Sequence, residues 1–173
     1  LLNAIILIIP LIIIRYGLPK FINKSANERA GFFPEPEGIE RSMLKIYRIT
    51  TISLLILLLF FSVNLKSPVN YIGLMLYLTG TFLYIKSIID FSRAPEYIVI
   101  TTGLYKYSRN PMYVAFFLYF LGINLMINSW LYFILLMIFQ FSAHFIILGE
   151  ERWCSQEYGQ DYIDYLKKVR RYI

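Results

Sequence analysis

Five long runs of apolar residues, separated by short polar connections, dominate this chain. The runs are Leu1–Ile14, Ile49–Leu65, Tyr71–Ile89, Met112–Ile127 and Trp130–Leu148. Four of them approach the ~20 residues with which an α-helix crosses a hydrocarbon core of about 30 Å. The pattern therefore predicts an all-α, polytopic membrane helix bundle of about five transmembrane helices.

The composition supports a membrane protein that forms one domain. The residues are 58% hydrophobic and 16% charged, with a mean hydropathy of +0.57, whereas soluble domains are ~45–50% apolar. We expect one membrane domain, 1–173, in which 1–89 holds the first spans and a loop and 90–173 holds the candidate site. The first run is short and starts without Met, so either the N-terminus is cut or Tyr16 and Leu18 complete the span. It lacks a basic leading region, and Pro10 interrupts it, which argues against a signal peptide.

The charged residues predict an orientation. When the runs are threaded alternately with the Arg15–Arg48 connection inside, every Lys, Arg, Asp and Glu except Lys66 lies inside or at the inner helix ends. Because Lys and Arg concentrate in cytoplasmic loops, the chemistry of this protein is expected at the cytoplasmic face. The net charge of +6 then reflects this bias rather than nucleic-acid binding. One His and one Cys offer no metal-ligand cluster, and Cys154 alone cannot form an internal disulfide.

The first internal connection is long enough to do more than join two spans. Its segment Gly31–Gly38 is too rich in Pro and Gly for a helix, whereas Ile39–Arg48 has helical spacing and leads into the second span. The segment Gly31–Gly38 is either a solvated connector or a lid on the substrate side.

The second internal connection, which ends at Pro111, is the most structured. Tyr97–Thr102 is β-branched and extended in character, Gly103 permits a turn, and Pro111 suits the first turn of a helix. The backbone N–H groups of that helix N-terminus, with Arg109 and Asn110, would form a site for a carboxylate or phosphate. The alternative is that Arg109 only reaches out to lipid headgroups.

Polar residues follow one face of the fifth run. Gln140, His144 and Glu151 have the spacing of a shared helical face, which predicts a polar wall toward the bundle interior. His144 is either a structural hydrogen-bonding residue or a proton carrier. Glu150 and Glu151 lie near a helix C-terminus, where the dipole disfavours anions, so they need a cationic or hydroxyl partner.

A last helix is expected after Gly159. One of its faces is apolar and aromatic and the rest is basic, which predicts an amphipathic helix that lies against anionic headgroups. The apolar face consists of Tyr162, Tyr165, Leu166, Val169 and Tyr172, and the basic residues are Lys167, Lys168, Arg170 and Arg171.

Two segments carry a family resemblance. Gly103-Leu104-Tyr105, followed by Arg109-Asn110-Pro111-Met112-Tyr113, resembles the Gly-x-Tyr … Arg-His-Pro-x-Tyr element of the integral membrane methyltransferases. The tail, with Glu150-Glu151, Tyr158-Gly159 and Val169-Arg170-Arg171, resembles their closing element. The family includes isoprenylcysteine carboxyl methyltransferases and phospholipid N-methyltransferases. The resemblance runs from about Tyr97 to the end of the chain.

This resemblance implies a membrane methyltransferase that uses S-adenosylmethionine, with a cytoplasmic cofactor pocket formed by the C-terminal half, 90–173. Its acceptor would be a lipophilic molecule from the bilayer, with a phospholipid amine, a prenylcysteine carboxylate or a similar group. The implied catalytic residues are Arg109, Glu150 and Glu151. The implied cofactor-binding residues are Tyr97, Ile98, Val99, Ile100, Gly103, Tyr105, Asn110, Pro111, Met112, Tyr113, Glu150 and Glu151. The expected partners are the lipophilic substrate and membrane lipids, with no nucleic acid and no metal.

The same residues suit this cofactor chemically. S-adenosylmethionine carries a carboxylate, an ammonium and a sulfonium, so its site needs an anion receptor, a carboxylate and aromatic or polarisable walls. Arg109 and Asn110 could supply the receptor, either Glu150 or Glu151 the carboxylate, and Met112 with the tyrosines the walls. Methyl transfer is an in-line displacement, so positioning can supply much of the catalysis without a protein nucleophile.

Two departures from the family pattern bear on the acceptor. Asn110 stands where His is usual, and Asn cannot titrate. The fifth run has no Arg in the turns before Glu150, only His144, which weakens a prenylcysteine carboxylate as acceptor and leaves an amine or hydroxyl open. Two other functions stay open as well: an NADPH-dependent membrane reductase like the sterol reductases, which resemble longer chains, and a non-catalytic membrane scaffold.

Overall fold

The computed structural model describes residues 2–173, without Leu1 of the first predicted span and without the side chain of Lys24. Its elements are η1 (Ala4–Ile8), α1 (Ile9–Ile12), η2 (Ile13–Gly17), α2 (Leu18–Ile22), α3 (Lys24–Arg29), α4 (Ile39–Leu57), η3 (Leu58–Phe60), α5 (Pro68–Arg93), η4 (Gly103–Lys106), α6 (Pro111–Ile127), α7 (Trp130–Tyr158) and α8 (Gln160–Lys168). Within residues 2–173, β-pairing is limited to two isolated bridges, so the prediction of an all-α fold is confirmed.

Four of these helical runs are long and apolar enough to cross a membrane. They are Ala4–Ile22, Ile39–Phe60, Pro68–Arg93 and Trp130–Tyr158. The remaining predicted span, α6, is a shorter apolar helix of 17 residues. Large apolar side chains cover the outside, such as Phe82 at 68% and Phe141 at 61% exposure. Such a surface suits lipid rather than water, so the chain is an integral, multi-pass membrane protein.

The helix ends follow local sequence signals. Ser67 and Asn70 form a capping box before α5, in which the Asn70 N–H donates to Ser67 Oγ at 3.3 Å and the Ser67 N–H donates to Asn70 Oδ1 at 3.0 Å. Pro111 begins α6, as predicted, because its missing N–H costs nothing in the first turn. The helix α7 runs unbroken from Trp130 to Tyr158, so Glu150 and Glu151 lie inside it and the prediction that they lie at a helix C-terminus is wrong.

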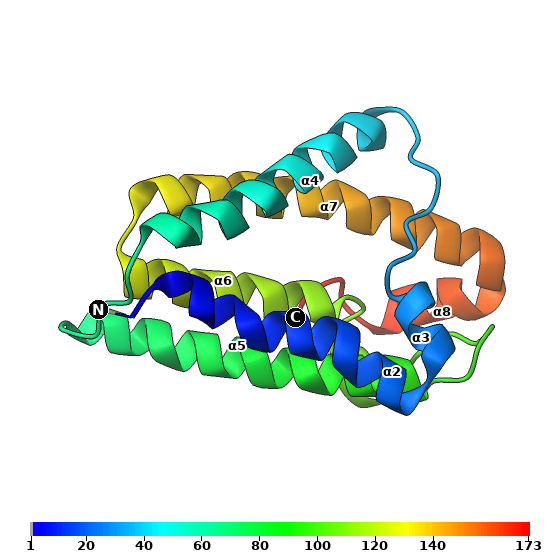
Figure 1. The fold of residues 1–173 in the computed structure, drawn as a ribbon. Helices are drawn as coiled ribbons and strands as arrows, with labels where there is room; N and C mark the ends of the chain where they lie inside the picture. The colour runs from blue at the N-terminus through cyan, green and yellow to red at the C-terminus, as the bar shows by residue number, and fades with distance from the viewer. Residues whose placement is uncertain (1) are drawn as a thin grey trace.

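The helices pack as two layers (Figure 1). One layer is α4 against α7, and the other is α5 against α6 with the N-terminal helices alongside α5. Buried apolar side chains from both layers meet between them, among them Leu54 of α4, Tyr119 of α6 and Leu136 of α7. The C-terminal segment enters between the layers, where it reaches residues of both.

Glycines let α5 and α6 approach closely. A Cβ atom on Gly122 would lie 2.4 Å from the Tyr77 nitrogen and 2.6 Å from the Gly73 oxygen. A Cβ on Gly80 would lie 2.5 Å from the Tyr119 nitrogen. Small residues are the usual means of close helix packing in membranes.

We expect Gly122→Ala to force α5 and α6 apart. Overpacking of this kind costs about 1–3 kcal/mol of the free energy of unfolding, so the Tm of the detergent-solubilised protein should fall. Gly17→Ala is the matched control, because its Cβ would meet only Ile13 Cγ2 at an ordinary 3.9 Å. Equal Tm values for the two variants would contradict the tight packing.

Candidate functional site

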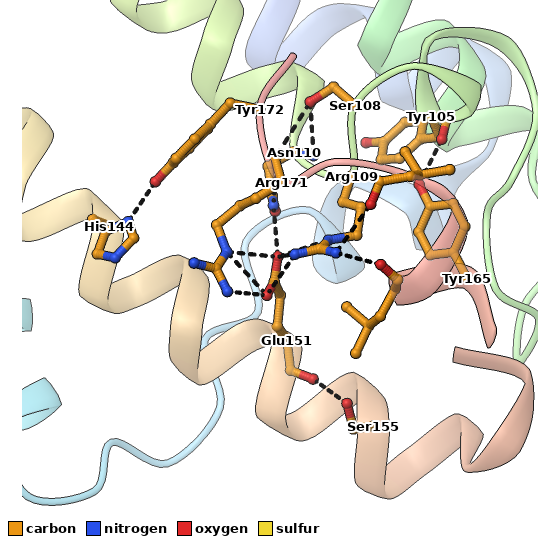
Figure 2. Close-up of polar contacts among 12 residues, drawn as sticks. Tyr105, Ser108, Arg109, Asn110, His144, Glu151, Ser155, Tyr165, Arg171 and Tyr172 are labelled. Carbon is orange, nitrogen blue, oxygen red and sulfur yellow. Dashed lines mark hydrogen bonds and ion pairs between the residues drawn. The ribbon is translucent and has the colours of Figure 1, made fainter. Parts of the chain in front are cut away.

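A buried carboxylate organises the end of the bundle where α6 begins and α7 ends (Figure 2). Glu151 is 6% exposed and receives hydrogen bonds from two guanidinium groups. Arg109 donates from Nε to Oε1 at 3.1 Å and from Nη2 to Oε2 at 3.2 Å. Arg171 donates from Nη2 to Oε2 at 2.9 Å. Paired bonds of this kind are strong and fix the orientation of the planar groups.

Arg109 also closes the last turn of α8. Its Nη1 donates to the carbonyl oxygens of Leu166 and Val169, both at 3.0 Å. Carbonyls at a helix C-terminus lack intrahelical partners and favour a cation. The side chain of Arg109 is only 9% exposed, so it binds within the protein and does not reach out to lipid headgroups.

Asn110 joins the same cluster through its amide. Its Nδ2 donates to Glu151 Oε1 and to the Arg171 carbonyl oxygen, each at 3.2 Å. A primary amide has two N–H donors on one nitrogen, whereas each nitrogen of a neutral imidazole donates at most once. Asn at position 110 therefore suits a double contact that a neutral His could not make from one atom. The structure thus brings three predicted site residues, Arg109, Asn110 and Glu151, into contact.

The C-terminal segment, Val169–Ile173, contributes residues that the sequence analysis did not place in the site. Ser108 and Arg170 form a parallel bridge, with the Arg109 N–H donating to the Arg170 oxygen at 2.9 Å. The Ser108 hydroxyl donates to the Arg171 oxygen at 3.3 Å. Tyr172 meets His144 of α7 at 2.7 Å. The basic run before Tyr172 was a visible signal, but nothing in the sequence showed which helices it would meet.

The last helix, α8, differs from the expectation that its apolar face lies against headgroups. Tyr162 and Tyr165 are buried, at 7% and 6% exposure, against the rest of the protein. The Tyr165 hydroxyl donates to the Tyr105 carbonyl oxygen at 2.6 Å, and burial raises the pKa of the Tyr165 phenol. The helical spacing was correct up to Leu166, but α8 ends at Lys168, so Val169 and Tyr172 of the predicted face lie beyond the helix. The buried side of α8 packs against α7 and the η4 turn rather than against headgroups.

Glu150 faces different groups from its neighbour Glu151. Its Oε1 accepts a hydrogen bond of 2.7 Å from the Tyr113 hydroxyl. Burial raises the pKa of the Tyr105 phenol well above its usual range, and nearby Tyr165, Glu150 and Asp90 raise it further. Tyr105 therefore lies within electrostatic range of two carboxylates, one on α7 and one on α5.

The predicted cofactor segment before Gly103 is irregular rather than extended in a strand. Tyr97 has φ 64° and is 83% exposed. An extended segment needs a partner edge, and the described residues offer none here. The segment instead borders a cavity of about 300 Å³, lined by Asp90, Arg93, Ala94, Pro95, Ile98, Val99, Ile100, Thr101 and Thr102.

Gly103 fixes the entrance to the η4 turn. It has φ 61°, a conformation that favours glycine, and a Cβ there would lie 2.1 Å from Asp90 Oδ2. Asp90 accepts a hydrogen bond from the Leu104 N–H at 2.9 Å and pairs with Lys86. Of the other predicted residues, Pro111 and Met112 form the first turn of α6.

The loop Gly31–Gly38 is non-helical, as predicted, and is attached to α7. Arg152 binds Glu37, donates to Glu40 Oε2 at 2.8 Å and donates to the Glu35 carbonyl oxygen at 3.1 Å. The Phe32 ring lies 5.0 Å from the Trp153 ring. The loop is therefore anchored to α7, although Phe32 and Glu37 remain exposed. Among residues 2–173, no three His, Cys, Asp or Glu side chains gather as a metal ion requires.

Long apolar helices around a buried charged cluster define a multi-pass membrane protein with a polar site at one end. The particular family follows from comparison with known sequences. The phospholipid methyltransferase family matches residues 68–161, more than half of the chain, and the chain belongs to this family. A relative described as protein-S-isoprenylcysteine O-methyltransferase, from Schizosaccharomyces pombe, is 28% identical over 116 residues, which cover 63% of this chain and 49% of that protein. The chain thus spans about half the length of that relative.

Proposed function

We propose that this chain is a membrane methyltransferase that transfers a methyl group from S-adenosylmethionine to a lipophilic acceptor. One observation carries the proposal beyond family membership. The two segments that bear the family motif are far apart in sequence, yet Arg109 and Asn110 of the first contact Glu151 of the second. The two halves of the motif therefore form one buried cluster in three dimensions. Following the charge distribution, we place this site at the cytoplasmic face.

The described residues suit the cofactor. Among the described side chains, Glu150 has one hydrogen-bond partner, the hydroxyl of Tyr113, so its carboxylate keeps capacity for an ammonium group. Tyr113 and Tyr105 provide aromatic walls beside it. The cavity of about 300 Å³ next to Ile98–Thr102 is at the lower end of the ~300–1,000 Å³ typical of small-molecule sites. We assign the cavity to the nucleoside part of the cofactor and Glu150 to its ammonium.

The two adjacent glutamates then have separate roles. Glu151 is fully engaged by Arg109, Arg171 and Asn110, so it acts as an anchor that holds the C-terminal segment over the site. Arg109 acts through Glu151 and the end of α8, as a positioning residue. Glu150 is the carboxylate that meets the cofactor.

The cofactor would supply an activated methyl group on sulfur, so the protein has to bind the two reactants, orient them and exclude water. The closed C-terminal segment supports water exclusion on one side. The loop Gly31–Gly38, held by Arg152 and Trp153, is assigned as a lid on the other side of α7. The acceptor, a phospholipid amine or another lipophilic group, would enter sideways from the bilayer.

Calorimetric titration of the detergent-purified protein with S-adenosylhomocysteine tests the cofactor class. We expect a dissociation constant of roughly micromolar, about −8 kcal/mol, and no binding of NADPH under the same conditions. Tight NADPH binding without S-adenosylhomocysteine binding would indicate a reductase. If a folded protein binds neither ligand, the proposed function is wrong.

A further inference from the structure

The single histidine of this chain is held by its C-terminal segment. The Nδ1 atom of His144 shares a 2.7 Å hydrogen bond with the Tyr172 hydroxyl (Figure 2). The two ring centroids lie 6.1 Å apart. We propose that His144, oriented by Tyr172, accepts the proton that an amine acceptor must lose when it is methylated. This inference rests on the proposed function and adds an acceptor-side residue to it.

The position of His144 suits an acceptor that comes from the bilayer. The residue lies on the same continuous helix as Glu150, six residues earlier, which is about 9 Å along the axis at 1.5 Å per residue. It is also two turns before Glu151, on the same helical face, and about 120° around the helix axis from Glu150. The imidazole is therefore deeper in the apolar span than the Glu150 carboxylate, and one rigid element fixes the offset between them.

Tyr172 is placed firmly enough to orient the ring. The carbonyl of the preceding residue, Arg171, accepts hydrogen bonds from Asn110 and Ser108. Burial raises the pKa of the Tyr172 phenol, so its hydroxyl stays neutral and available for hydrogen bonding. When Nδ1–H donates to the Tyr172 oxygen, the Nε2 atom of His144 keeps a lone pair.

The charges around this pair favour an amine over a carboxylate as the acceptor. On the side of the tail, Arg171 and Arg109 both bind Glu151. On the side of α6, Tyr113 donates to Glu150, and on the side of α4, Glu40 pairs with Arg152. An incoming carboxylate would have to compete with Glu151 for Arg109 and Arg171, which share it, and with Glu40 for Arg152. An incoming ammonium meets the imidazole of His144 and the phenol of Tyr172.

The proposed step balances as follows. The ammonium gives one proton to Nε2 of His144, which frees the nitrogen lone pair. The lone pair forms the new N–C bond as the C–S bond breaks, and the electrons of that bond remain on sulfur as S-adenosylhomocysteine. His144 then releases the proton to water. A positioned imidazole of this kind contributes typically about 10²–10⁴-fold to the rate.

NMR of the His144 imidazole tests whether an amine acceptor binds beside it, without requiring methyl transfer. Because the chain has one His, ring-labelled histidine gives one imidazole signal set in dodecyl maltoside micelles. With S-adenosylhomocysteine present, dodecylphosphoethanolamine should shift this signal, and dodecylphosphocholine, which has the same phosphate and tail but no N–H, should not. Tyr172→Phe should remove most of the shift. Identical responses to the two amphiphiles would overturn the inference.

The pH profile of methyl transfer gives the second test. For His144→Gln we expect a rate about 100-fold lower near neutral pH, recovering as rising pH deprotonates the amine itself, with S-adenosylhomocysteine affinity unchanged. A parallel pH profile in wild type and variant, or faster methylation of a carboxylate amphiphile, would overturn the role of His144 and leave the methyltransferase intact. A wild-type protein that binds no S-adenosylhomocysteine would overturn the proposed function, and this inference with it.

Discussion

Glu151→Gln is expected to release the C-terminal segment and to destabilise the whole protein. The variant leaves the Arg109 and Arg171 guanidinium groups near one another without the anion that both of them bind. Removing one partner of a buried ion pair typically costs about 3–5 kcal/mol, because the remaining charge is uncompensated. Arg109 has a 9% exposed side chain, so water cannot readily replace the carboxylate.

Two measurements check this expectation. Thermal unfolding in detergent should show a lower Tm, and trypsin should cut more readily at Lys167, Lys168, Arg170 and Arg171 once the segment is free. Glu157→Gln is the matched control, since Glu157 is exposed on the same helix. If Glu151→Gln resists trypsin as well as the control does, Glu151 is not the anchor.

The helices of this fold could be predicted from sequence because lipid leaves the backbone few choices. A segment such as Trp130–Leu148 must satisfy its own N–H and C=O groups, and an apolar run of that length does so as a helix. The exact ends were less predictable. The helical spacing of Ile39–Arg48 correctly marks the start of α4 at Ile39, but the apolar run to Leu65 overshoots the end of the helix, which lies at Leu57 and is followed by η3 to Phe60.

Three members of the buried cluster, Arg109, Asn110 and Glu151, were singled out from the sequence, but their contacts could not be predicted. Glu150 and Glu151 are neighbours in sequence, yet adjacent helical residues point about 100° apart, so only one can face the two arginines. The sequence does not tell which, because the choice depends on the rotation of α7 against α6. Arg171 and Tyr172 were harder still, since their partners, Glu151 and His144, are 20 and 28 residues away.

Glu150→Gln is expected to weaken binding of S-adenosylhomocysteine while leaving the fold intact. The substitution keeps the side-chain shape and an oxygen that can accept the Tyr113 hydroxyl, so the Tm should stay close to that of the wild type. It removes the charge that we assign to the cofactor ammonium. A hydrogen bond to a charged group contributes about 1.5–3 kcal/mol, which corresponds to roughly 10- to 100-fold in affinity.

Comparing Glu150→Gln with Glu151→Gln distinguishes a loss of cofactor binding from a loss of stability. Calorimetry with S-adenosylhomocysteine should separate them, because Glu150→Gln loses affinity without losing stability, whereas Glu151→Gln loses stability first. Unchanged affinity in Glu150→Gln would exclude Glu150 as the ammonium partner, whatever the result for Glu151. The opposite pattern, with a stable Glu151→Gln that no longer binds, would mean that the cofactor displaces Arg171 from Glu151. In that case the closed C-terminal segment would have to open before the cofactor can enter.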